Sequence, residues 1–129
     1  AAHICGFGAT LPNGARGVTS VRLVSATGSS ILSEVPPTRW QLERYPLTGD
    51  AVSLRVRHGG FLLGADVFDN IFFGVSPAEA TAMDPQQRLL LEHGYGAFHG
   101  AGLRRDVLEG VGSGIFLGIA AADWSDIVK

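Results

Sequence analysis

Cysteine is almost absent from this sequence, since Cys5 is the only one in 129 residues. A single cysteine excludes an internal disulfide and a cysteine-based zinc cluster, and it favours a reducing intracellular compartment. The chain begins Ala1-Ala2-His3, without the basic and apolar regions of a secretory signal. It also lacks an apolar run of about 20 residues, so the sequence predicts no membrane span.

The sequence also lacks an excess of charge of either sign. The 10 Lys and Arg residues stand against 12 Asp and Glu, a formal net charge of −2. A chain with this balance lacks the excess of positive charge that would attract nucleic acid or an anionic membrane. Mean hydropathy is +0.22 and 46% of the residues are hydrophobic, as in globular proteins. The length suits one domain with its own core.

The N-terminal third contains short elements and turns. An apolar run over 4–7 predicts a buried strand, in which Gly6 and Gly8 would allow another backbone to approach closely. Proline and Asn-Gly predict a turn over 11–14. Residues 17–32 fit either a helix or irregular structure.

The middle of the chain predicts extended structure. Pro36-Pro37 indicates an extended path, and residues 41–53 indicate a loop. Apolar residues alternate with arginine over 54–58, which predicts a strand with one solvated face.

Two helix starts follow. Ser76 with Glu79 forms the pattern of a capping box. Asp84 opens the longest predicted helix, which runs from Pro85 to about Ala101. Gly102 is placed to end it as the residue just past the last turn. Gly94, Gly96 and Gly100 interrupt it, and each interior glycine costs about 0.8–1 kcal/mol relative to alanine.

A continuous apolar run occupies residues 115–120, after a short helical turn over 104–109. Such a run is typical of a strand buried on both faces of a layered α/β fold. The predicted fold class is therefore α/β.

Five blocks of the sequence, in order, resemble the N-terminal region of β-ketoacyl synthases (ketosynthases) of the modular polyketide synthase and animal fatty acid synthase type. The blocks are Glu34 to Trp40, Gly59 to Leu62, Phe68 to Ala80, Ala82 to Glu92 and Ile115 to Gly118. The fourth is the most specific, and it contains Met83, Asp84, Pro85, Gln86, Gln87 and Arg88. Residues 13–32 diverge, because they lack the family's Trp- and Leu-bearing first helix.

The resemblance implies a thiolase-like fold of α-β-α-β-α layers, of which residues 1–129 would form the first portion as a single partial domain. It also implies decarboxylative Claisen condensation of acyl and malonyl-type thioesters on an acyl carrier protein, with a phosphopantetheine arm carrying the chain. No other cofactor and no metal is implied, and the complete enzyme would be a homodimer.

The family nucleophile is a cysteine on a strand-to-helix elbow, assisted by two later histidines. None of these three motifs occurs in this sequence. We therefore expect the chain not to catalyse condensation alone.

Each substitute for these groups has a simpler structural interpretation. Cys5 is predicted to be a small buried hydrophobe. His99 imitates the family's His-Gly-Thr-Gly motif, but its position at a helix C-terminus favours interaction with the helix dipole. His58 is expected on a strand surface. His93 and His99 lie on different helix faces, which argues against a shared metal site.

A structural role is predicted for residues 83–88, with no catalytic one. Asp84 should cap its helix and Arg88 should pair with it one turn later. Gln86 and Gln87, in the first turn, can bond to neighbouring loops. Large aromatic residues favour core packing over an acyl pocket: they are Trp40, Phe61, Phe68, Phe72 and Phe73. Three arginines favour a solvated face over carrier-protein docking: Arg39, Arg55 and Arg57.

Two functions remain open from the sequence. The chain is a segment of a condensing ketosynthase, or it is a non-catalytic remnant that serves as a structural subunit of a larger assembly. In both cases the run over 115–120 needs cover from the remainder of the ketosynthase domain or from another protein chain. We therefore expect the isolated chain to be poorly soluble or to dimerise.

Overall fold

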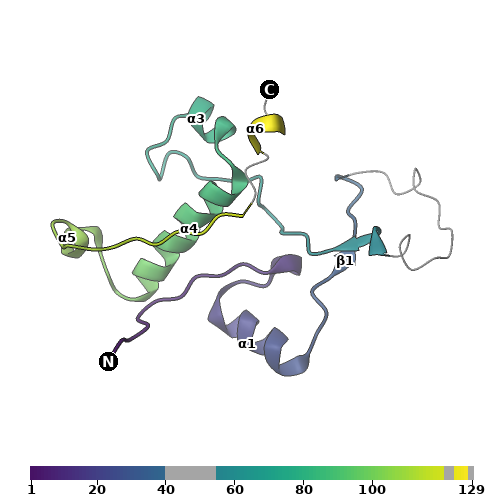
Figure 1. Cartoon of the computed structure of the whole chain (residues 1–129), viewed down its shortest axis with the longest axis horizontal. Coiled ribbons are helices and arrows are strands. Elements are labelled where there is room, and N and C mark those ends of the chain that lie inside the picture. Colours follow the sequence, from purple (N-terminus) through teal and green to yellow (C-terminus); the bar gives the residue numbers. More distant parts are fainter. Residues whose placement is uncertain (40–54, 121–123, 128–129) are drawn as a thin grey trace. The chain divides into compact units, whose positions relative to one another are not determined.

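The computed structural model describes residues 1–39, 55–120 and 124–127 (Figure 1). This part of the chain is mostly helical and holds one small two-stranded sheet. It divides into two compact units. One comprises Ala9–Leu63, called here the 9–63 unit, and the other joins Ala1–Gly8 to Gly64–Lys129 and is called here the helical unit.

The 9–63 unit begins with the predicted turn. A single 3-10 turn, η1, spans Pro12–Gly14, and the Leu11 amide donates to the Ala15 carbonyl at 2.8 Å. Asn13 and Gly14 have φ values of 64° and 77°. This left-handed backbone is the conformation that Asn-Gly tolerates best, so the prediction for 11–14 is confirmed.

Helix α1, Gly17–Thr27, resolves the ambiguity of residues 17–32. It ends at Gly28, whose φ of 62° breaks the helix as a left-handed glycine commonly does. No residue of α1 is buried, and Leu23 is 63% exposed. The helix is thus formed by local bonds without a core beneath it.

The sheet pairs β1, Ser33–Glu34, with β2, His58–Gly59, in antiparallel register. Ser33 lies opposite Gly59, and Glu34 lies opposite His58. The Arg57 guanidinium bonds the Glu34 carboxylate at 3.0 Å. Val35, next to this ion pair and only 3% exposed, is the one buried hydrophobic residue in the described part of the chain. The described part of the chain therefore has almost no buried core of its own.

Two predictions for this region need correction. The strand predicted over 54–58 is reduced to β2, with turn geometry at Val56 and Arg57 and with Leu54 outside the described residues. The path predicted to be extended after Pro36 closes as a turn, because the Arg39 amide donates to the Pro36 carbonyl at 2.8 Å. The predicted loop over 41–53 lies outside the described residues.

The helical unit is built around one long helix, α4, which Figure 1 shows as its largest element. Its helices are α3 (Pro77–Ala82), α4 (Pro85–Gly100), α5 (Arg105–Leu108) and α6 (Trp124–Ile127). None of the described helices combines the length and the apolar character that a membrane crossing requires.

Both predicted helix starts are confirmed by their caps. The Ser76 hydroxyl accepts from the Glu79 amide at 3.2 Å, and an Asp84 carboxylate oxygen accepts from the Gln86 amide at 2.7 Å. Each helix also has proline in its first turn, where the missing amide hydrogen costs nothing.

The end of α4 is a Schellman motif. The Leu103 amide donates to the Phe98 carbonyl at 2.9 Å, and the Gly102 amide donates to the His99 carbonyl at 3.0 Å. Gly102 has a φ of 72°. The predicted C-terminal glycine is thus confirmed, and the orphan carbonyls of the last turn are satisfied.

The first eight residues form no strand, which corrects the prediction for 4–7. Ile4 is 92% exposed, because no other strand pairs with this segment within the described residues. The predicted close approach is nevertheless present. A β-carbon on Gly6 would collide with the Ala97 carbonyl oxygen. A β-carbon on Gly8 would lie 2.7 Å from the His93 carbonyl oxygen.

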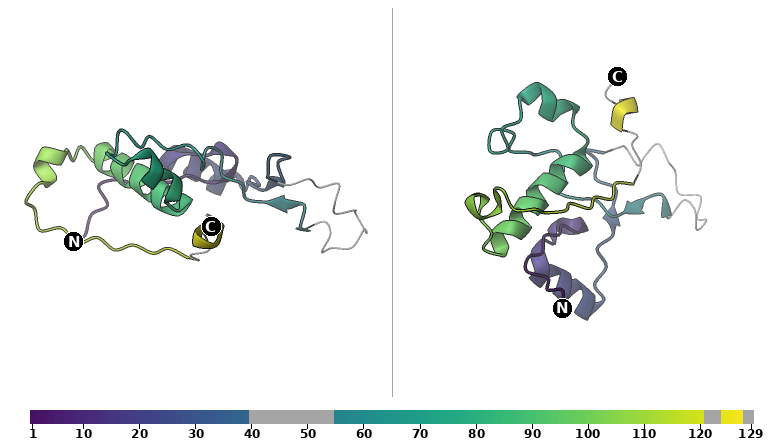
Figure 2. Two further views of the ribbon diagram at one scale, coloured as in Figure 1. Left: turned by 90° about the horizontal axis from the view of Figure 1, so that it is seen from above. Right: turned by 60° about the vertical axis from the view of Figure 1, so that its left-hand side comes forward.

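The predicted buried strand over 115–120 is also absent. Figure 2 shows the described residues that follow α5, up to residue 120, as an extended trace, and they form no helix or strand. Phe116 is 98% exposed and Ile115 is 77% exposed. A strand gains its stability from ladder bonds and packing on both faces, and neither is supplied here.

Candidate functional site

Residues 83–88, from the most specific block of the resemblance and called here the family motif, form the junction between α3 and α4. Met83 caps the end of α3, where its amide donates to the Glu79 carbonyl at 2.9 Å. Asp84 caps the start of α4, and Pro85 is its first residue. The motif therefore sets the turn between two consecutive helices.

Gln86 occupies both carboxylate oxygens of Asp84. Its amide donates to Oδ1 at 2.7 Å, and its side-chain Nε2 donates to Oδ2 at 3.3 Å. The Gln87 amide donates instead to the Asp84 backbone carbonyl at 2.9 Å. The Asp84 side chain therefore caps α4 through Gln86, and the Gln86 side chain bonds back to this cap within the same turn.

Arg88 does not pair with Asp84 in the part of the chain that the structure describes. Its guanidinium lies over the Trp124 ring at 5.7 Å, a cation–π geometry. The Trp124 indole Nε1 in turn donates to the Ala82 carbonyl at 3.0 Å. The side-chain Nε of Arg88 is buried without a hydrogen-bond partner. The motif therefore holds α6 against the α3–α4 junction.

Removing the Asp84 cap should loosen the start of α4. We expect Asp84→Ala to cost about 1 kcal/mol, because it removes the carboxylate that accepts from the Gln86 amide and caps the helix. Hydrogen exchange of the amides in the first turn should accelerate. Asp84→Asn is the matched control, since its amide oxygen retains the cap, and equal acceleration in both variants would contradict this assignment.

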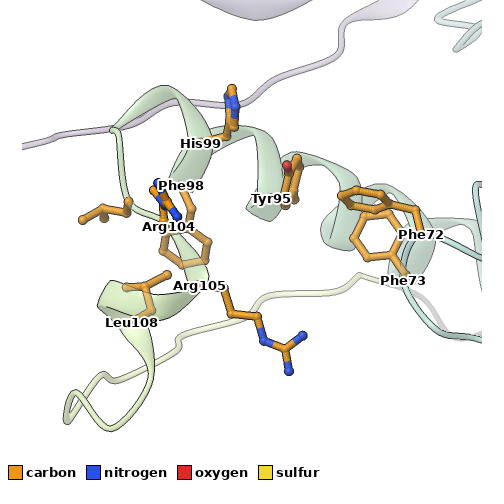
Figure 3. A pocket seen from close by; sticks show the side chains of 9 residues that line it. Phe72, Phe73, Tyr95, Phe98, His99, Arg104, Arg105 and Leu108 are labelled. Atoms are coloured by element: carbon orange, nitrogen blue, oxygen red, sulfur yellow. The ribbon is translucent and has the colours of Figure 1, made fainter.

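An aromatic groove lies along α4 and α5 (Figure 3). The cavity has a volume of about 520 Å³. Phe72 meets Tyr95 edge to face with ring centroids 4.8 Å apart, and Phe68 stacks on Phe73 at 5.2 Å. The lining is completed by residues from the end of α4, from α5 and from the segment between them: Phe98, His99, Leu103, Arg104, Arg105 and Leu108.

The structure gathers only part of the predicted aromatic set. Phe68, Phe72 and Phe73 lie together in the helical unit, whereas Phe61 belongs to the 9–63 unit and Trp40 lies outside the described residues. Phe72 is 56% exposed, so this cluster is an open surface rather than a closed core.

Charge at the groove is partly compensated. Arg104 bonds the Asp106 carboxylate at 3.1 Å, and both side chains are largely exposed. His99 lies in the last turn of α4, as predicted, and stacks on Tyr95 with centroids 5.8 Å apart. The Arg104–Asp106 ion pair joins two solvated side chains at the edge of the groove, and such exposed pairs contribute little to the stability of the fold.

The candidate side chains Cys5 and His58 are both exposed in the structure. Cys5 is exposed, which corrects its predicted burial, and its thiol lies 3.9 Å from the His3 carbonyl oxygen. His58 is exposed in β2, as expected. Among the described residues, no three His, Cys, Asp or Glu side chains cluster as metal ligands would.

Trp124 is the site residue that the sequence did not indicate. Its contacts join residues far apart in the chain, and no spacing rule links an isolated tryptophan to a distant arginine. The preference of arginine for aromatic faces was the one available signal, and it does not identify which aromatic residue is the partner.

Comparison with known proteins identifies the family. The model of the β-ketoacyl synthase N-terminal domain matches residues 2–129. The phthioceranic/hydroxyphthioceranic acid synthase of Mycobacterium tuberculosis (strain ATCC 25618 / H37Rv) is 36% identical over 95% of this chain. The highly reducing polyketide synthase PKS6 of Gibberella zeae is 38% identical over 97% of it.

A solved structure agrees with these relatives. The ketosynthase from module 6 of the bacillaene synthase from Bacillus subtilis 168 matches 95% of this chain with a TM-score of 0.79 and 28% identity. The chain covers 20% of that structure, and it covers 6% and 5% of the two relatives. The family match over nearly all of its residues shows that the chain belongs to the β-ketoacyl synthase family, as an N-terminal ketosynthase domain of the polyketide synthase type.

Proposed function

We propose that this chain is the N-terminal segment of a ketosynthase that condenses acyl and malonyl-type thioesters on an acyl carrier protein by decarboxylative Claisen chemistry. The observation that carries this proposal is the fold match to a ketosynthase over 95% of the chain. In the layered thiolase-like fold, the segment supplies structure, and the reacting groups come from elsewhere in the enzyme.

The environment of Cys5 supports this division of labour. A catalytic thiol needs a base, a cation or a helix N-terminus to stabilise its thiolate. Cys5 precedes every helix of its unit, and its hydrogen bond reaches a backbone carbonyl, which cannot stabilise negative charge. The acyl thioester is therefore expected on another cysteine.

The first test is to read the transcript beyond the Lys129 codon and to measure the intact mass of the native polypeptide. A ketosynthase requires an Ala-Cys-Ser-Ser elbow shortly downstream. That polypeptide, incubated with an acyl thioester, should gain the mass of one acyl group and then release carbon dioxide from a malonyl-loaded carrier protein. Absence of the elbow and of acylation would contradict the proposal.

Cys5→Ser in the same polypeptide should leave acylation unchanged, because Cys5 is not the nucleophile. Peptide mapping of the acylated protein checks this directly. Acyl label on the peptide that holds Cys5, or loss of labelling in Cys5→Ser, would assign the chemistry to this segment instead.

A non-catalytic remnant that serves as a structural subunit is the second candidate. The observation that favours it is the near absence of buried hydrophobic residues, since Val35 alone is buried among those described. Such a segment needs cover from the remainder of the domain or from another polypeptide, whether or not it takes part in catalysis. Stable co-purification with a larger assembly, without acyl transfer, would support this function.

A further inference from the structure

Arg88 carries a buried side-chain donor that has no hydrogen-bond partner among the described residues. This donor is its Nε. The Trp124 ring lies 5.7 Å from the guanidinium carbon and attracts the positive charge, but an aromatic ring is only a weak acceptor for an N–H group. Buried polar groups in native proteins are normally paired, because an unpaired one has lost its bonds to water without replacing them. The Arg88 side chain is therefore suited to a further partner.

The carboxylates one turn away on the same helix do not supply this partner. Asp84, four residues earlier, has both carboxylate oxygens bonded to Gln86. Glu92, four residues later, forms no ion pair within the described part of the chain. The charge of Arg88 is thus balanced by no carboxylate among the described residues.

The shape of a guanidinium group determines which acceptor fits. The Nε atom and one terminal nitrogen lie side by side along one edge, and their hydrogens point in the same direction. A carboxylate meets such an edge with both oxygens and forms two parallel, charge-assisted hydrogen bonds. It also compensates the positive charge, which a backbone carbonyl or a water molecule cannot do. The acceptor that fits this edge best is therefore a carboxylate.

The surroundings hold the Arg88 edge in place. The Arg88 backbone amide donates to the Asp84 carbonyl at 3.2 Å, within the first turns of α4. Trp124, whose ring lies against the guanidinium, is itself fixed by the bond from its indole Nε1 to the Ala82 carbonyl. An incoming carboxylate therefore meets a donor edge that is already ordered, which favours binding.

We propose that the Nε edge of Arg88 binds a carboxylate of the ketosynthase domain that lies outside residues 1–129. This inference rests on the proposed function, under which the chain is one segment of that domain. The chain covers 20% of the matched ketosynthase structure, so about four fifths of such a structure lie beyond it. The contact ties the α3–α4 junction to the remainder of the domain, and it gives the family motif a part in assembling the enzyme.

Zero-length crosslinking of the native polypeptide identifies the partner. Arg88→Lys replaces the guanidinium with an amine, which a carbodiimide joins to an adjacent carboxylate: the activated carboxyl carbon forms an amide bond with the amine, and the carbodiimide leaves as a urea. Peptide mapping should find residue 88 joined to an Asp or Glu outside residues 1–129. Arg22→Lys is the matched control, since Arg22 is exposed in α1, and it should not form this crosslink. No crosslink from Arg88→Lys, or one only to a carboxylate within residues 1–129, would overturn the proposal.

A double-mutant cycle separates the carboxylate from Trp124. Arg88→Met keeps an unbranched side chain without its donors or its charge, and Trp124→Leu removes the ring. Amide hydrogen exchange of α4 in the native polypeptide should accelerate about tenfold in Arg88→Met, because charge-assisted hydrogen bonds are lost. A similar acceleration should occur when Trp124→Leu is already present. If Arg88→Met has no further effect in that background, Trp124 is the sole partner and the proposal is wrong.

Acylation of the same polypeptide distinguishes a failure of this inference from a failure of the proposed function. A wild-type polypeptide that accepts an acyl group, while Arg88→Lys gives no crosslink outside residues 1–129, refutes the Arg88 contact alone. A crosslink outside these residues in a polypeptide that accepts no acyl group supports the contact and refutes the catalytic role.

Discussion

Gly6→Ala should release the first eight residues from α4. A β-carbon at this position would collide with the Ala97 carbonyl oxygen and would lie 3.2 Å from the Ala101 side chain. The Ala97 carbonyl belongs to the backbone of a helix and cannot rotate away. Forcing an extra methyl group into such a contact costs about 1–3 kcal/mol, and the N-terminal segment is the element free to move.

The single cysteine provides the measurement. A nitroxide attached to Cys5 should broaden the amide signals of α4 around His93 and Ala97 in the wild-type chain, and the Gly6→Ala variant should lose this broadening. Gly112→Ala is the matched control, because no atom lies within 4 Å of the position where its β-carbon would be. Retained broadening in Gly6→Ala would show that the contact does not hold the segment.

The combined variant Gly94→Ala, Gly96→Ala and Gly100→Ala should strengthen α4 by about 2–3 kcal/mol. All three glycines are helical, and no atom lies within 4 Å of the β-carbon that each would gain. Alanine therefore adds no clash, and it removes the backbone entropy that glycine loses on helix formation. The circular dichroism signal at 222 nm should deepen and should persist to higher temperature.

Gly102→Ala is the matched control, because it shows whether alanine raises helix stability at any glycine or only at the helical ones. Its β-carbon would also meet no atom within 4 Å, but its φ is 72°. An L-residue there costs about 1–2 kcal/mol, so this variant should lose helical signal. A gain in helicity from Gly102→Ala, or none from the triple variant, would contradict the interpretation of α4.

Local features of the fold were predictable from the sequence. The caps at Ser76 and Asp84 and the glycine at Gly102 follow from neighbouring residues alone, because each bond is made within about one helical turn. The turn at Asn13-Gly14 was predictable for the same reason. The close backbone approach at Gly6 was inferred from residue type, although its partner, α4, was not.

Features that need a distant partner were not predictable. The strands expected over 4–7 and 115–120 do not form in the described chain, because an apolar run pairs only where another strand presents its backbone. The burial of Cys5 depended on the first of these strands and was wrong with it. Arg88 had a local acceptor in Asp84, yet Gln86 occupies that carboxylate and Arg88 lies on Trp124.

The contact of Gly6 with α4 bears on the order in which the chain folds. Gly6 and Ala97 are separated by the whole 9–63 unit, so their contact closes a long loop, and the entropy of closure grows with the logarithm of loop length. On the ribosome, the first eight residues emerge long before α4 exists. The 9–63 unit can therefore form early. The first eight residues can pack on the helical unit only after α4 has been synthesised and has folded. High sequence separation of this kind slows folding, and it makes this contact a late event in the maturation of the chain.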